Sequence, residues 1–230
     1  HDMQIRDVVA LMSFNETSLQ QNSYRKQINS VFGAANFGWR NLIYLDATIR
    51  GDKSSTLPIS NNIYVYPSVS GSFVFSELIN RSEILPYGKL RMSLAQVGSD
   101  TDPYKLGLVY TKSKFTYPGY TLGSIDNEMI PNKNLKPTKT NSFEIGFETK
   151  FFKKRIGLDF TYYNQISRNQ IMGMASTWAT GYPYRLINAG EIQNQGVEIA
   201  LNTRPVQVGD FSWDLNINFS KNNNKVKKLT

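Results

Sequence analysis

Acidic side chains recur at alternating positions in several stretches of this 230-residue chain, and they are its first candidates for chemistry. Two such carboxyl groups facing each other could act as general acid and base, as in glycoside hydrolysis. A strand face that contacts water carries charged groups anyway, and we favour that interpretation. We therefore predict no catalytic residue and a protein that is not an enzyme. The carboxylates considered are Glu144, Glu148, Asp159, Glu198 and Asp214.

Residue content gives little support to metal binding or nucleophilic catalysis. The chain has no cysteine, and its one histidine is His1. Residues 98–102 (GSDTD) and 51–55 (GDKSS) carry oxygen ligands, but neither stretch has the spacing of a known calcium loop. We expect solvated turns there, with no metal site and no cofactor.

The formal net charge of +8 could suggest a nucleic-acid partner. The basic residues are scattered, however, and no RNA-binding motif is present, so we predict none. The exception is a group of lysines among asparagines near the end of the chain, Lys221, Lys225, Lys227 and Lys228. We interpret it as a solvated loop, and contact with anionic lipopolysaccharide or an acidic ligand remains the alternative.

Residues 141–166 (NSFEIGFETKFFKKRIGLDFTYYNQI) position three of the carboxylates. Every second residue from Phe143 to Phe151 is apolar except Thr149, and the alternation resumes at Ile156 after a basic turn. This period of two is typical of β-strands. If Phe152 pairs with Arg155 across the turn, Phe151 lies opposite Ile156 and both apolar sets share one face. The pattern predicts an antiparallel hairpin with one apolar and one polar face.

Strand length favours a membrane environment over a soluble sandwich. Soluble strands usually have about five or six residues, whereas a tilted membrane-spanning strand needs about ten. Alternating segments of this length, separated by turns, are the signature of outer-membrane barrels. No apolar run is long enough for a membrane helix. Further strands are expected in six stretches, at 27–36, 41–50, 63–78, 87–98, 194–205 and 211–220.

The connections between these strands alternate in length. We expect short links near Phe37, Ile79, Lys153 and Val206, and long loops at 51–62, 99–138 and 167–189. Pro67 predicts a local bulge, because proline cannot donate a ladder hydrogen bond. Short turns at one end and long loops at the other are typical of an outer-membrane barrel.

The predicted fold is all-β: an antiparallel, up-and-down transmembrane β-barrel segment of about eight strands. An open sheet of eight strands would leave two unpaired edges in hydrocarbon, which lipid does not tolerate. We therefore expect residues 1–230 to be one wall section of a larger barrel.

Several stretches, in order, resemble the barrel of SusC/RagA-type TonB-linked outer-membrane transporters. The resemblance runs from about Asn29 to the end. It is carried by YLDATIRGDKSSTLP, YPSVSGSFVFSE, LRMSLAQVGSDTDPY, NLKPTKTNSFEIGFETKFFKKRIGLDFTYYNQISRNQI and INAGEIQNQGVEIALNTRP. It implies a twenty-two-stranded barrel, of which the N-terminal plug domain and the last strands are expected to be missing from this sequence.

The resemblance also implies function and partners. Such proteins import oligosaccharides or oligopeptides across the outer membrane of Gram-negative bacteria, with a SusD-like surface lipoprotein as lid and energy from TonB. TonB would act through the missing N-terminal regions, and outer-membrane lipid and lipopolysaccharide would surround the barrel. The alternative is a small outer-membrane or soluble β-domain that binds surface glycans or mediates adhesion without transport.

Aromatic residues in the expected extracellular loops are the candidate ligand- or partner-binding residues. Their rings could stack on sugars, clamp a peptide or pack against the lipoprotein lid; alternatively, they pack the loops onto one another. The candidates are Tyr104, Tyr117, Tyr120, Trp178, Tyr182 and Tyr184. By contrast, we interpret Phe151, Phe152 and Trp213, near the short turns, as membrane-interface anchors.

Overall fold

The structure is a computed structural model that describes residues 23–79, 83–108, 110–112, 120, 123–125 and 129–229. One sheet dominates it, and its eight long strands pair antiparallel with their neighbours in the order β1-β2-β3-β4-β8-β9-β10-β11. These strands are β1 (Ile28–Trp39), β2 (Ile43–Ser54), β3 (Ile63–Phe73), β4 (Tyr87–Ser99), β8 (Thr138–Phe151), β9 (Ile156–Ala175), β10 (Tyr184–Val208) and β11 (Phe211–Lys228).

The remaining elements lie in the links between the long strands. Strand β7 pairs in parallel with β10, and β5 pairs with β6 in a separate small sheet. The short strands are β5 (Tyr110–Lys112), β6 (Gly123–Ile125) and β7 (Met129–Ile130). The 3-10 helices are η2 (Ile59–Asn61), η3 (Phe75–Glu77) and η4 (Trp178–Thr180). None of the described helices is long and apolar enough to cross a membrane.

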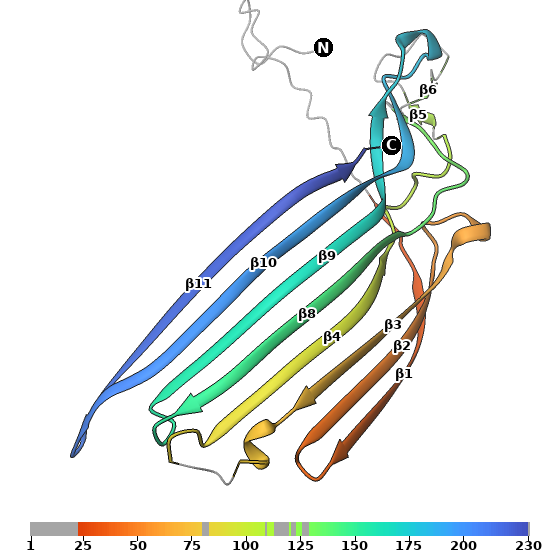
Figure 1. Ribbon diagram of the computed structural model, residues 1–230. Helices are drawn as coiled ribbons and strands as arrows, with labels where there is room; N and C mark the ends of the chain where they lie inside the picture. The colour runs from red at the N-terminus through yellow and green to blue at the C-terminus, as the bar shows by residue number, and fades with distance from the viewer. Residues whose placement is uncertain are drawn as a thin grey trace, which may run out of the picture.

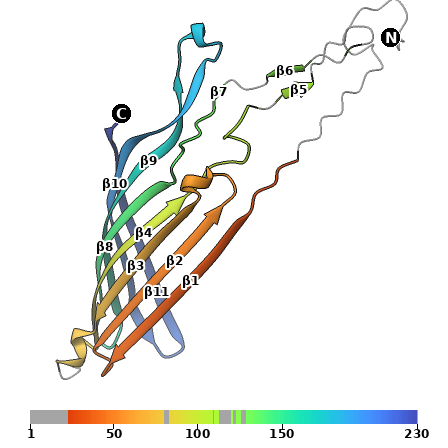
Figure 2. The same ribbon diagram turned by 90° about the vertical axis from the view of Figure 1, so that its right-hand side faces the viewer.

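The long strands form a slanted, curved wall, with β1 and β11 at its two edges (Figures 1 and 2). The all-β, antiparallel, up-and-down prediction is confirmed. Within the described residues the sheet is open, as expected for a section of a larger barrel.

The central hairpin has the predicted register. Phe151 lies opposite Ile156, and the amide of Arg155 donates to the carbonyl of Phe152 at 3.1 Å. Phe152, Lys153 and Lys154 have positive φ angles of 51°, 55° and 69°, which close the turn tightly. The predicted strands β8 and β9 are therefore confirmed, and both extend beyond the predicted segment.

Cross-strand pairing gathers the apolar residues on one side of the wall, here called the apolar face. One row of directly opposed residues crosses five strands: Leu90, Phe147, Phe160, Ile199 and Phe219. Within it, the rings of Phe147 and Phe160 stack with centroids 5.4 Å apart. The residues between these positions point to the opposite side, here called the polar face. Both faces follow from the alternation in the sequence.

The links at one end are 40–42, 74–86, 152–155 and 209–210, and those at the other end are 55–62, 100–137 and 176–183. The link predicted to be short near Ile79 spans 74–86 and is longer than 55–62 and 176–183, so the length rule is only partly right. Segment 74–86 packs on neighbouring turns: the amide of Val74 donates to the carbonyl of Leu42 at 2.8 Å, and the amide of Phe152 to that of Ile84 at 3.0 Å.

Most strands are longer than predicted, mainly because polar segments also pair; the exception is the predicted strand 63–78, which ends at Phe73 and is followed by η3. Much of the predicted loop 167–189 belongs to β9 and β10. Their pairing begins with Ala175 opposite Tyr184 and continues to Ile156 opposite Thr203. The lysine and asparagine segment that we expected to be a solvated loop lies in β11, where Lys225 is opposite Gln193. Both loop predictions were wrong, since backbone hydrogen bonds extend a strand whatever the polarity of its side chains.

The predicted bulge at Pro67 is also wrong. The β2–β3 register runs without a shift through Ile49 opposite Pro67. Pairing of β3 with β4 instead covers only Ser68 to Phe73. Because Pro67 lacks an N–H, it lies where one of the two ladders ends.

Candidate functional site

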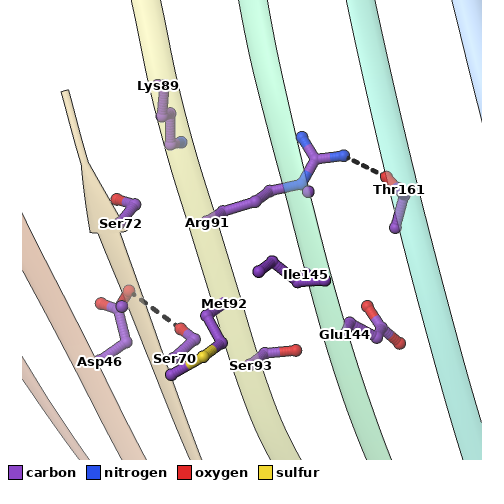
Figure 3. Close-up of a pocket in the computed structure, with 12 residues that line it drawn as sticks. Asp46, Ser70, Ser72, Lys89, Arg91, Met92, Ser93, Glu144, Ile145 and Thr161 are labelled. Atoms are coloured by element: carbon purple, nitrogen blue, oxygen red, sulfur yellow. Dashed lines mark hydrogen bonds between the residues drawn. The ribbon is translucent and has the colours of Figure 1, made fainter. Parts of the chain in front are cut away.

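The polar face carries a shallow hollow that extends over five strands (Figure 3). Serine and threonine hydroxyls surround it together with charged groups of both signs. Its polar lining includes Asp46, Ser70, Lys89, Arg91, Glu144 and Thr161. Such a surface can form many hydrogen bonds to a polar chain or to water.

Arg91 crosses a whole strand within this hollow. Its guanidinium reaches from β4 over β8 to β9, where it donates to both carboxylate oxygens of Asp159 at 2.9 and 2.6 Å. It also donates to the hydroxyl of Thr161 at 2.6 Å. The crossing takes place over Gly146, which lies opposite both Arg91 and Thr161. A bidentate pair of this kind fixes geometry as well as charge.

The absence of a side chain at Gly146 makes this crossing possible. A Cβ there would lie 2.8 Å from Nε of Arg91 and 2.8 Å from the carbonyl oxygen of Phe160. A second crossing has the same design, because Tyr163 passes over Gly196 and donates to Asn222 on β11 at 3.2 Å. Both glycines therefore serve close packing.

Gly146→Ala is expected to destabilise the folded wall by about 1–3 kcal/mol, the usual cost of overpacking. The matched control is Gly157→Ala on β9, where the nearest atoms would lie 3.8 Å from the new Cβ. Urea unfolding of the membrane-inserted full-length protein measures both. Equal stability of the two variants would show that the crossing does not need the glycine.

Ion pairs engage three of the five carboxylates considered as acid or base. Asp159 pairs with Arg91, Glu148 lies 3.5 Å from Lys150, and Asp214 receives two hydrogen bonds from Arg204. Each of these three carboxylates therefore faces a cation. This arrangement supports the hydrated-surface interpretation.

A second polar cluster ties segments together at the end of the wall with the longer links. Asp100, directly after β4, accepts hydrogen bonds from Lys26 Nζ at 2.6 Å and from the hydroxyls of Ser54 and Thr56. Burial by itself raises the pKa of Asp100, but these donors outweigh it and bring the pKa below its ordinary value. Asp100 thus joins segments that are distant in sequence; the predicted turn at 98–102 is partly β4 and partly this cluster.

The Asp100 cluster is expected to loosen in acid. A lowered folded-state pKa stabilises the fold above the ordinary carboxyl pKa of about 4, and the contribution is lost as pH falls through the folded-state value. Hydrogen exchange of residues 54–56, corrected for intrinsic rate, should rise over that range. Asp100→Asn should exchange faster at neutral pH and lack this acid transition; a transition that persists in the variant would contradict the assignment.

A small hydrophobic core, here called the loop core, lies beside this cluster. Its buried members are Leu57, Tyr64, Leu135 and Leu186. Leu135 is fully buried, and the Asn188 side chain holds the next residue by accepting from the amide of Lys136 at 2.8 Å and donating to its carbonyl at 2.7 Å. The long link is therefore fastened to β10.

The predicted aromatic residues fall into separate groups. Trp178 (78 % exposed), Tyr182 and Tyr184 share the tip of the tall β9–β10 hairpin (Figure 1). Tyr104 is exposed elsewhere, and its hydroxyl accepts from the amide of Arg25 at 3.1 Å. Tyr120 is exposed, and Tyr117 lies outside the described residues. The structure thus brings three of the six candidates onto one hairpin.

Sequence reasoning missed the Arg91 crossing, the Asp100 cluster and the loop core. The sequence did contain an indication of the Arg91 crossing, because Gly146 lies between Glu144 and Glu148 on the charged face of its strand. For Asp100 and Leu135 the partners lie in links distant in sequence. No periodicity points to them.

Comparison with known proteins completes the description. Residues 5–228 match the family model described as TonB dependent receptor-like, beta-barrel. The chain is 29 % identical over 206 residues to TonB-dependent receptor P26 of Formosa agariphila, covering 88 % of this chain and 21 % of that protein. It is 27 % identical over 221 residues to TonB-dependent receptor SusC of Bacteroides thetaiotaomicron, covering 92 % and 22 %.

A solved structure of the RagAB peptide transporter has the same fold over 99 % of this chain and 26 % of that one, with a TM-score of 0.82 at 23 % identity. The chain thus spans about a fifth of the length of the curated relatives it matches. These relatives are described as receptors. With its two-faced antiparallel wall and a family match over nearly its whole length, the chain belongs to the TonB-dependent-receptor-like β-barrel family.

Proposed function

We propose that these residues form part of the barrel of a SusC-type importer in the outer membrane of a Gram-negative bacterium. The observation that carries the proposal is the eight-stranded antiparallel wall with one apolar and one polar face, in a chain of this family. Such a wall suits lipid on one side and a wet lumen on the other. Unpaired edges at β1 and β11 are costly in hydrocarbon, so we place the section within a longer polypeptide that supplies further strands and a plug domain.

The imported substrate, in this proposal, is an oligosaccharide or an oligopeptide. A hydroxyl-rich, charged polar face would let such chains exchange hydrogen bonds with the wall as they pass. A SusD-like surface lipoprotein would close the barrel from outside, and TonB would supply energy through the plug. The likeness to SusC and to the RagAB peptide transporter supports this choice.

We further propose the six aromatic residues predicted from the sequence as contacts for the substrate or the lipoprotein. Trp178 at the tip of the β9–β10 hairpin is the foremost candidate, since its ring is largely exposed. Tyr104, Tyr117, Tyr120, Tyr182 and Tyr184 complete the set. Trp178→Ala should then weaken substrate capture or lipoprotein association without changing barrel stability.

The deciding experiment isolates the full polypeptide from detergent-extracted outer membranes and measures its intact mass, with peptide mapping over residues 1–230. We expect a polypeptide several times larger than these 230 residues and a lipoprotein that co-purifies with it. Deletion of the gene should abolish uptake of the oligosaccharide or peptide. A species ending near Thr230 that is soluble without detergent would instead favour the glycan-binding or adhesion module.

A further inference from the structure

Cations line the apolar face along one edge, at the end of the wall with the longer links. On β11 the apolar row runs from Trp213 to Phe219, and the next residue on that face is Lys221. Lys221 lies opposite Val197, which belongs to the apolar alternation of β10, whereas its neighbour Asn222 receives the hydrogen bond from Tyr163 on the polar face. Lys221 therefore points to the same side as the apolar row.

The same boundary continues on the neighbouring strands. Lys225 follows Lys221 on β11, and Lys139 on β8 lies opposite Arg168 on β9. These four side chains, Lys139, Arg168, Lys221 and Lys225, are here called the cationic strip.

Charge within the strip is strongly unbalanced. Its adjacent carboxylate is Glu191, which accepts from Nε of Arg168 at 2.7 Å. Among the described residues, Lys139, Lys221 and Lys225 form no ion pair. Three ammonium groups thus remain available just beyond the apolar row.

On β4, β8, β9 and β10 a band of side-chain amides lies beyond the apolar row on this face, whereas on β11 Lys221 follows Phe219 directly. Gln96 donates to Asn141 at 2.8 Å across β4 and β8, and Gln193 donates to Asn164 at 2.8 Å and to Gln195 at 3.1 Å. Apolar, amide and cationic side chains therefore follow one another along one face. This is the order of groups met by an amphiphile whose acyl chains lie on the apolar row and whose headgroup lies on the strip.

We propose that the cationic strip binds the phosphate groups of an anionic glycolipid in the outer leaflet, with the lipid's acyl chains on the apolar row beneath. Ammonium groups bind phosphate as point charges and do not need a fixed geometry. A free anion would use only the cations, whereas a lipid also uses the apolar row. The inference rests on the proposed outer-membrane location and assigns a lipid-binding site to specific residues of the wall.

The test uses the full-length protein, purified in a neutral detergent, and a bis-phosphorylated glycolipid added to the micelles, with binding measured by native mass spectrometry. Lys221→Gln/Lys225→Gln should weaken binding about 30-fold, since each lysine near an anionic headgroup contributes about fivefold. The matched control is Lys153→Gln/Lys154→Gln, which removes the same charge at the opposite end of the wall and should bind as the wild type does.

The other arms separate the possible outcomes. Inorganic phosphate at the same concentration should not displace the glycolipid; displacement would indicate a free-anion site and overturn the proposal. Unchanged binding in the double variant, or equal loss in the control, would also overturn it. Membrane fractionation and uptake are measured separately, so a failure of the import function is distinguishable from a failure of the lipid site.

Discussion

Ile217→Arg is expected to lower the unfolding free energy of the membrane-inserted protein by about 2–4 kcal/mol, the cost of arginine facing lipid near the bilayer midplane. Ile217 lies on the apolar face, with 49 % of its surface exposed, and directly opposite Leu201. It lies midway between Trp213, the predicted interface aromatic, and Lys221, the first cation beyond the apolar row. Its position on the strand is therefore the one at which lipid contact is deepest.

The matched control is Asn218→Arg, one residue further along the same strand. Asn218 points to the polar face, where the new guanidinium would lie near Glu198, on the side proposed to face the lumen. It should change stability little. Urea titration of the full-length protein in lipid vesicles measures both variants, and Leu158→Arg, two strands away in the same apolar row as Leu201, provides a repeat.

Two results would contradict this assignment of the faces. If Ile217→Arg and Leu158→Arg insert and unfold as the wild type does, lipid does not contact the apolar face. If Asn218→Arg instead carries the full cost, the two faces have been assigned the wrong way round. Either result would remove the basis for the proposed import function.

Leu135→Ala is expected to open the loop core, at a cost of about 2–5 kcal/mol for removing a fully buried leucine side chain. Leu135 has no exposed surface and packs with Leu57, Tyr64 and Leu186. The core lies beside the strands' ends and not within the wall, so the loss should be local. Opening should free the link that Asn61 and Asn188 hold by hydrogen bonds to Leu135 and Lys136.

Limited trypsin digestion measures this opening, because Lys133, which is followed by Asn134, is exposed on the same link. Cleavage there should accelerate by about 30-fold or more, since each 1.4 kcal/mol is a factor of ten. Ile59→Ala is the control, as Ile59 lies in the adjoining link with 92 % of its surface exposed. Cleavage at wild-type rate in Leu135→Ala, with urea unfolding of the wall altered instead, would contradict a local role.

The two largest expected effects differ in how they could be found. Ile217 is identified by alternation alone, because a strand has a period of two and its neighbours fix which side is apolar. Leu135 lies between an asparagine and a lysine in an irregular, proline-rich stretch, and nothing in its immediate surroundings indicates burial. Only contacts with residues that are distant in sequence bury it.

By itself, the sequence determined the strand class, the register of the central hairpin at Phe151 and Ile156, and the two faces, because these depend on residues within a few positions of each other. Strand ends were decided by the tertiary structure: β9 continues to Ala175 and β11 to Lys228 through polar residues whose backbone pairs with β10. The tertiary structure also decided the Arg91–Asp159 crossing over Gly146 and the burial of Leu135. Each joins segments whose separation along the chain carries no period, and only the folded sheet brings them within contact distance.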